Sequence, residues 1–198
     1  MAIRRVAQMG NPILHQIAAP IEDPTAQEVV QLAEDMKDTL VEIGGSGLAA
    51  PQVFESVRVV VYRLSKRVNS EIKETHGPWI VMINPELALL TETTNLGWER
   101  CLSIPGLHGK VPRARRVKIR YLTLDGELVN HEAEGAHANL LQHECDHLDG
   151  ILYTMRMTDL SKLAFNAEPG QLAEEFANGE ELSPRMQKLV EAWTGRNQ

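Results

Sequence analysis

The stretch His143–His147 contains two histidines and a glutamate whose types and spacing suit a metal-dependent hydrolase. If this stretch is helical, residues four positions apart lie on one face, so His143 and His147 can direct their imidazoles at one metal ion. Glu144 follows the first ligand directly, where an attacking water molecule would need a base. Apolar residues on both sides would bury this helix, and unpartnered imidazoles are costly in a core. The pattern therefore predicts a metal site and leaves the class of hydrolase open.

The third ligand separates the possible classes. One protease pattern places a histidine three residues after Gly150, but that position holds Tyr153. Another takes a glutamate downstream, and the glutamates between 168 and 175 lie near or beyond a break at Pro169–Gly170. The better candidate lies upstream at Cys101, whose thiolate would complete a Cys-His-His site with a fourth position open for water.

Length and composition indicate what kind of protein carries this site. A chain of 198 residues suits one domain with an appendage, and 43% hydrophobic with 24% charged residues is ordinary for a soluble protein. A net charge of -7 gives no general attraction to nucleic acid or to an anionic membrane. No apolar run is long enough to cross a bilayer, and the first residues do not resemble a secretion signal. With only two cysteines, a reducing, cytoplasmic location is expected.

Several elements can be predicted around the metal motif. Pro24 and a capping box of Thr25 with Glu28 start a helix that Gly44–Gly45 ends. Gly135 precedes the helix with the histidines, which ends near Asp149–Gly150. The segments between them are predicted as a buried strand at 57–64, a surface loop at 65–78, a short strand at 80–83 closed by Asn84–Pro85, and a hairpin of 116–124 with 127–134. Short strands around one helix favour the α+β class.

The chain from Thr158 onward differs from the rest. It carries a net charge of -3, from seven acidic and four basic residues, and its apolar residues are sparse. A last helix is predicted over Pro184–Trp193. Two readings of this acidic tail stay open: a helical cover packed on the domain, or a disordered end.

Three stretches, in this order, resemble the motifs of the peptide deformylase family. They are Gly45-x-Gly47-Leu48-Ala49-Ala50-x-Gln52, Glu99-x-Cys101-Leu102-Ser103 and Gln142-His143-Glu144-x-Asp146-His147. The resemblance covers residues 1–157, which we take as the catalytic domain, and leaves 158–198 as an acidic, partly helical tail. It implies an α+β fold with short antiparallel or mixed sheets around a central metal-binding helix, an N-terminal helix and a C-terminal helical tail.

The resemblance also implies an activity. Deformylases remove the formyl group from the N-terminal formylmethionine of newly made polypeptides and release formate. Cys101, His143 and His147 would bind one divalent metal ion, usually ferrous iron in the family, although zinc, nickel or cobalt can occupy such a site. Glu144 would take a proton from water and later deliver it to the departing amine.

The same resemblance assigns roles around the metal. The Gln52 side-chain amide and the backbone N–H of Leu102 would stabilise the oxyanion, and Ser46 with Gly47 would pair with the extended substrate backbone. The family usually has glycine where this chain has Arg100, so we expect weaker or altered substrate preference. Two alternatives remain: a deformylase-like paralogue with another amide substrate or only a binding role, and a zincin-type metalloprotease.

Further expectations concern partners and neighbouring residues. The substrates would be N-formylmethionyl nascent peptides, and we expect a monomer; some bacterial deformylases dock on the ribosome through a basic C-terminal helix, which the acidic tail does not support. Glu99 is expected to pair with Arg113, and Gln142 to hydrogen-bond near the metal ligands. Cys145 is predicted to be a core residue, and Trp98 a packing residue close enough to line a pocket. The histidines outside the motif are predicted at the surface or in loops: His15, His76, His108, His131 and His137.

Overall fold

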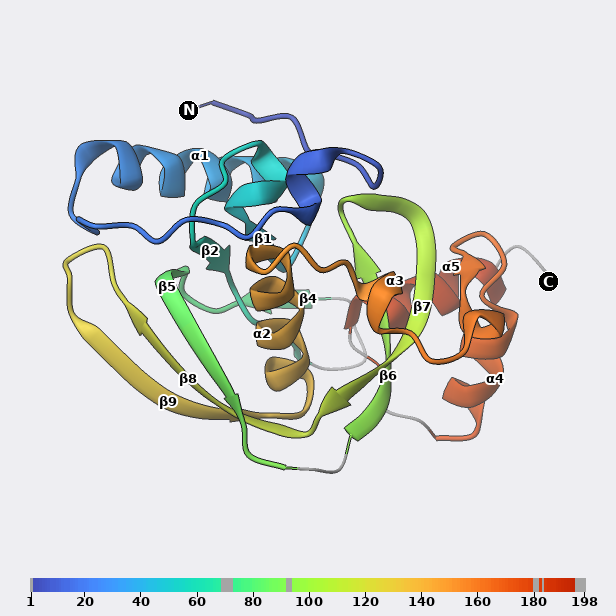
Figure 1. The fold of residues 1–198 in the computed structure, drawn as a ribbon. Helices are drawn as coiled ribbons and strands as arrows, with labels where there is room; N and C mark the ends of the chain where they lie inside the picture. The colour runs from blue at the N-terminus through green and yellow to red at the C-terminus, as the bar shows by residue number, and fades with distance from the viewer. Residues whose placement is uncertain (1, 69–72, 92–93, 180–181, 183, 195–198) are drawn as a thin grey trace.

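The computed structural model describes residues 2–68, 73–91, 94–179, 182 and 184–194. Figure 1 shows sheets wrapped around a central helix, α2 (Gly135–Leu148). Other helices are α1 (Gln27–Ile43), α3 (Tyr153–Arg156), α4 (Gly170–Ala177), α5 (Pro184–Thr194), and the 3-10 turns η1 (Pro12–His15), η2 (Ala50–Val53) and η3 (Leu160–Lys162). The strands are β1 (Gly47–Ala49), β2 (Val59–Tyr62), β3 (Ser65–Val68), β4 (Lys73–His76), β5 (Ile80–Leu89), β6 (Thr94–Cys101), β7 (Ile104–Ala114), β8 (Arg116–Leu122), β9 (Leu128–Glu134) and β10 (Ala164–Phe165). The predicted α+β class is confirmed.

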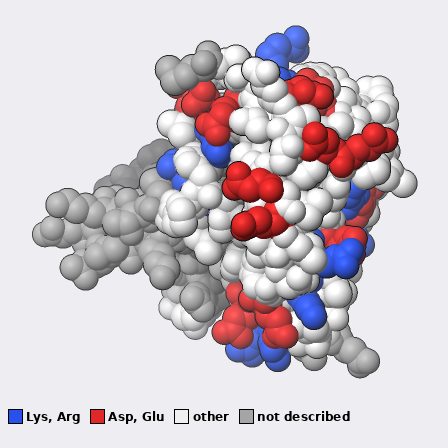
Figure 2. All heavy atoms as spheres, turned by 90° about the vertical axis from the view of Figure 1, so that its left-hand side faces the viewer, with Lys and Arg blue, Asp and Glu red and all other residues white. Residues whose placement is uncertain are grey.

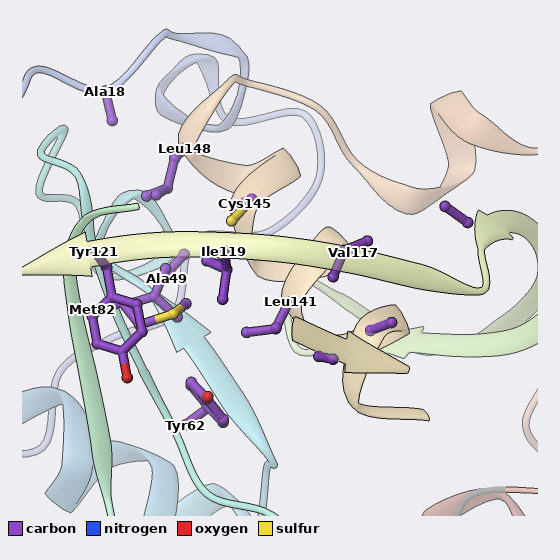
Figure 3. Packing of buried hydrophobic residues seen from close by; sticks show 14 residues of the cluster. Ala18, Ala49, Tyr62, Met82, Val117, Ile119, Tyr121, Leu141, Cys145 and Leu148 are labelled. Atoms are coloured by element: carbon purple, nitrogen blue, oxygen red, sulfur yellow. The ribbon is translucent and has the colours of Figure 1, made fainter. Parts of the chain in front are cut away.

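The largest sheet is antiparallel, with the strand order β1-β2-β5-β8-β9. Its concave side holds α2, whose Leu141, Cys145 and Leu148 pack against side chains from the strands (Figure 3). Cys145 is 7% exposed, so its prediction as a core residue is confirmed. The predicted hairpin is also confirmed, because β8 and β9 pair along their whole length.

Strand β2 explains why the sequence 59–62 is apolar without a break. Successive side chains of a strand point to opposite faces. Val60 and Tyr62 join the core around α2, whereas Val59 and Val61 join a second core beneath α1. All four residues are buried, because this part of the sheet has a helix on each side.

Helix α1 covers the sheet face away from α2, with Leu32, Met36 and Leu40 in the second core. It ends as predicted: Gly44 has a φ of 73°, and its N–H donates to the carbonyl of Leu40. The expected capping box is wrong. The Asp23 carboxylate accepts from the N–H and hydroxyl of Thr25 instead, and the helix begins at Gln27 with no side-chain cap.

A second antiparallel sheet has the strand order β10-β7-β6. Its hairpin of β6 and β7 spans residues 94–114, a region where no strand was predicted, and it carries Cys101 at the turn. Helices α4 and α5 of the tail lie beside this hairpin (Figure 1). The prediction of a last helix from Pro184 is confirmed, and α4 adds a helix that the sparse apolar residues did not indicate.

Two further predictions were wrong, a loop and the end of a strand. The segment 65–78 contains the hairpin β3–β4, whose turn residues 69–72 lie outside the described part. The strand starting at Ile80 does not stop at Asn84–Pro85; Asn84 takes a φ of 51°, and β5 resumes after a shift in pairing to β8. Of the predicted tail, residues 180–181, 183 and 195–198 also lie outside the described part.

Among the described residues, no helix has the length and apolarity to cross a membrane.

Candidate active site

The predicted metal ligands come together from two elements. Helix α2 places His143 and His147 one turn apart, with ring centroids separated by 5.0 Å. The turn after β6 brings Cys101 to them, and its Sγ lies 3.2 Å from Nε2 of His147. The three potential ligand atoms all lie within 4.8 Å of one another, and each of these residues is buried in this cluster. A thiolate and two imidazole nitrogens at this spacing suit one divalent ion.

Glu99 holds the first histidine in position. Its carboxylate lies 2.7 Å from Nδ1 of His143, and because an ionised carboxylate only accepts, Nδ1 must donate. This leaves Nε2 of His143 for a metal, the tautomer found when a carboxylate supports a metal-binding histidine. Glu99 also accepts two hydrogen bonds from Arg113, at 2.7 and 3.0 Å, which confirms the predicted pair. Arg113 continues to Asp146, the residue before His147.

The buried charges favour an ionised site. Burial by itself would raise the pKa of Glu99, but hydrogen bonds from His143 and Arg113 lower it to about 2. Burial likewise opposes ionisation of Cys101, yet the charge of His147 and hydrogen bonds with both histidines hold the pKa of the thiol well below its ordinary value. Thiolate is the form of cysteine that binds metals, so the residues present fit a divalent cation.

Glu144 lies beside the ligands with a different environment. It is 3% exposed, and burial raises the pKa of its carboxyl, an effect that the charges of Cys101 and Glu99 reinforce and those of the two histidines oppose. Its Oε2 has no hydrogen-bond partner among the described residues. A Cβ atom at Gly47 would overlap this carboxylate. Glycine at position 47 thus lets the Glu144 carboxylate keep its place, and one carboxylate oxygen is left available for a proton.

Gln52 lies on the other side of Cys101. Its Oε1 accepts from the Ala49 N–H at 2.9 Å, which fixes the amide so that Nε2 faces Sγ of Cys101 at 3.5 Å and Oγ of Ser103 at 3.1 Å. The Ser103 N–H also points at this sulfur, at 3.4 Å. Donors therefore converge on the cysteine, as a thiolate requires.

A pocket of about 320 Å³ opens onto these groups. Eight of the predicted catalytic, substrate-binding and metal-binding residues line it, and His147 does not. The eight are Ser46, Gly47, Gln52, Arg100, Cys101, Leu102, His143 and Glu144. Residues that sequence reasoning missed also line it, among them Arg63, Leu64, Asn139 and Met186. No ligand-type spacing marks these four residues, because only the folded chain brings them together. A second hollow, of about 610 Å³, lies by Arg5 and Phe54 and is lined by none of the site residues.

Comparison with known proteins agrees with this geometry. Residues 3–163 match the family model described as polypeptide deformylase. The chain belongs to the polypeptide deformylase family. A peptide deformylase of Nitrosomonas europaea is 41% identical over 171 residues, covering 85% of this chain and 97% of that protein. One of Prochlorococcus marinus is 39% identical over 169 residues, covering 85% of this chain and 88% of the relative.

Solved deformylase structures share the fold. A Met-Ala-Ser-bound crystal structure of a class I type b peptide deformylase from Acinetobacter baumannii has a TM-score of 0.71 at 40% identity, covering 79% of this chain and 100% of that one. The peptide deformylase from Thermotoga maritima has a TM-score of 0.69 at 31% identity, covering 80% of this chain and 100% of the other. The chain is accordingly a peptide deformylase-type hydrolase that removes the N-formyl group of nascent peptides, in a metal-dependent family.

Membership in this family removes the metalloprotease alternative. The rings of Tyr153 and His143 are stacked with their centroids 6.3 Å apart, and Tyr153 belongs to the apolar cluster that includes Cys101. Glu175, one of the downstream glutamates, instead accepts a hydrogen bond from Trp98 at 2.6 Å. Cys101, and neither Tyr153 nor Glu175, joins the two histidines in the cluster of potential ligand atoms.

Some neighbouring residues differ from expectation. The Gln142 side chain does not reach the ligands; it bonds to the backbone N–H and carbonyl of Ala114, each at 2.9 Å, and thereby joins α2 to β7. His108 is 1% exposed on β7, so its prediction as a surface or loop residue is wrong. His131 and His137 stack on each other, and His137 lines the pocket. Trp98 both packs and lines the pocket, as its prediction allowed.

Proposed function

We propose that Cys101, His143 and His147 hold one divalent metal ion, most readily Fe²⁺, with Zn²⁺, Ni²⁺ and Co²⁺ as alternatives. The observation that carries this proposal is the convergence of one cysteine sulfur and two histidine nitrogens within 4.8 Å. Such a donor set accepts several first-row ions, and availability selects among them. When bound, the cation would supply Lewis-acid stabilisation of negative charge developing on the formyl oxygen.

Glu144 is the proposed proton carrier. The net reaction adds water across the formyl C–N bond, giving formate and a free amine. Glu144 Oε2 takes the proton of the attacking water and returns it to the nitrogen as the C–N bond breaks. Burial favours this exchange, because a carboxyl with a raised pKa holds a proton more readily than an exposed one.

The remaining site residues are proposed to bind the oxyanion and the backbone of the substrate peptide. We assign the Gln52 amide and the Leu102 N–H to the oxyanion, because the first is fixed beside Cys101 and the second lies in the turn that follows it. Ser46 and Gly47 would pair with the substrate backbone. In support, β1 is the terminal strand of its sheet, so an extended peptide can add beside it.

The substrate is proposed to be an N-formylmethionyl nascent peptide. Arg100 lines the pocket and is proposed to alter substrate preference without removing the metal. We take 1–157 as the catalytic domain and 158–198 as a tail. Because every assigned group comes from one chain and the substrate is a new peptide, we propose a monomer that acts in the cytoplasm.

Formate release tests the function directly. Protein purified without oxygen is supplied with formyl-Met-Ala-Ser, and formate is measured for the wild type, Glu144→Gln and the control Glu132→Gln. Glu132 is exposed on β9 and its only role in the described structure is a surface ion pair with Arg116. We expect formate from the wild type and the control, and a loss of at least about 100-fold in Glu144→Gln. Formate production independent of Glu144, or none from any protein, would refute the proposal.

A further inference from the structure

The C-terminal tail is fastened to the strand that carries Cys101. Trp98, three residues before the cysteine, forms one apolar cluster with buried residues of the tail: Leu172, Ala173, Leu182, Met186, Leu189 and Val190. The Trp98 indole N–H donates to Oε2 of Glu175 on α4 at 2.6 Å, and Nζ of Lys110 reaches the same oxygen at 2.7 Å. Packing and this hydrogen bond fix the indole in its present place at the pocket wall.

The tail also reaches the pocket itself. Met186 on α5 is 3% exposed and lines the same pocket as the candidate metal ligands Cys101 and His143. Helix α5 packs next to β3, which follows the lining residues Arg63 and Leu64. Helix α5 therefore lies against β6 through Trp98 and close to the β3 strand that continues from two lining residues. This helix lies beyond residues 3–163, the part that matches the family.

Part of β6 contributes no side chain to the pocket. Gly97 lines the pocket without a side chain, and a Cβ there would lie 2.9 Å from Nδ2 of Asn139. A side chain at position 97 would collide with α2, so the strand stays bare here, and Met186 is the tail residue that lines the same pocket. Met186 offers an apolar, flexible thioether there.

We propose that Met186, held against Trp98 by the tail, forms one wall of the substrate pocket and limits the width of the side chain carried by the formylated residue. The proposal rests on the proposed function, because it concerns the same pocket. It makes the tail a determinant of substrate preference, in addition to a cover over the hydrophobic surface around Trp98.

Paired substrates and paired variants test the wall. The value of kcat/KM is measured for formyl-Met-Ala-Ser and formyl-Phe-Ala-Ser with the wild type, Met186→Ala, Met186→Leu and Leu189→Ala. Leu189 is a matched control, because it is buried in the same tail cluster without lining the pocket. The ratio of the two values is independent of how much protein is folded or metal-loaded.

Shortening Met186 to alanine removes three heavy atoms from the wall. A single methylene in an apolar pocket changes discrimination by about 10-fold or more, so Met186→Ala should shift the ratio at least about 10-fold toward the phenylalanine peptide. Met186→Leu and Leu189→Ala should stay within about 2-fold of the wild type. An equal shift in Leu189→Ala, or none in Met186→Ala, would overturn the proposal.

A binding measurement separates this proposal from the function on which it rests. The product-like peptides Met-Ala-Ser and Phe-Ala-Ser are titrated calorimetrically into zinc-loaded wild type and Met186→Ala. A ratio of Kd values that shifts toward Phe-Ala-Ser supports the wall even if no protein releases formate, in which case only the proposed reaction fails. An unchanged ratio of Kd values, or no binding of either peptide to the wild type, overturns the proposal that Met186 limits the width of the pocket.

Discussion

Replacing Arg113 should destabilise the metal-free protein by several times more than replacing an exposed arginine. Arg113 is 4% exposed and binds the buried carboxylates of Glu99 and Asp146. In Arg113→Met both carboxylates would lose their buried cation, and breaking such a pair costs about 3–5 kcal/mol. Arg116→Met is the control, because its ion pair with Glu132 is half exposed and worth about 1 kcal/mol or less.

The pKa of Glu99 gives a second estimate of this magnitude. It falls from 4.5 to about 2 in the folded protein, against the effect of burial and because of hydrogen bonds from His143 and Arg113. At about 1.4 kcal/mol for each tenfold change in proton affinity, this difference corresponds to about 3 kcal/mol of stability above the unfolded pKa. Arg113 supplies part of this stabilisation of Glu99, and its ion pair with Asp146 adds to the stability that Arg113→Met should lose.

The assay is urea unfolding followed by circular dichroism, after removal of metal by a chelator. Because the folded pKa of Glu99 is depressed, its stabilisation is complete above pH 4.5 and is lost as the pH falls toward 2. We expect Arg113→Met to lose about 3 kcal/mol at pH 7, and the gap to the wild type to shrink toward pH 3. The reasoning is refuted if Arg113→Met and Arg116→Met lose equal stability at pH 7, or if the gap widens on acidification.

Three further predictions follow from the site. Gly47→Ala should lower kcat/KM about 100-fold by displacing the Glu144 carboxylate while metal content measured by atomic absorption stays unchanged; full activity would contradict the overlap. Chelation should abolish activity and lower the Tm. Zinc at 100 times its Kd should then restore about 2.7 kcal/mol of unfolding free energy in the wild type but not in Cys101→Ala. Equal recovery in both proteins would argue against Cys101 as a ligand. Burial raises the pKa of Cys145 to about 12, so a thiol reagent at pH 7 should leave it unmodified, and mass spectrometry of the labelled protein would reveal any exception.

Much of the metal site could be predicted from the sequence because its spacing is local. His143 and His147 are four residues apart on a helix, and the α-helical repeat alone brings them together. Cys101 lies more than 40 residues away, so periodicity does not place it beside them; it is predicted because the protease ligand positions hold no suitable residue, and the family resemblance supports it. The pair of Glu99 and Arg113 was predicted from the family resemblance, and the structure confirms it.

The strands that were missed lack the patterns on which prediction depends. Strand β7 contains prolines at 105 and 112 and glycines at 106 and 109, which are typical of turns, yet it pairs with β6 over most of its length. Strands β3 and β4 are polar and pair with each other, so no alternating apolar residues marked them. Met186 could not be placed at all, because its position depends on how α5 packs against Trp98.

Strand β6 connects the metal centre to the pocket wall through the alternation of its side chains. The Glu99 carboxylate meets His143 of α2 and Arg113 of β7, whereas its neighbour Trp98 points toward the tail and Glu175. Ion pairs and hydrogen bonds hold the first side in place, and apolar packing together with the contacts of Trp98 and Lys110 to Glu175 holds the second. Substitutions in the tail can therefore alter the width of the pocket while Glu99 and Arg113 keep the ligands in position. A pocket built in this way can change its substrate preference without changing its chemistry.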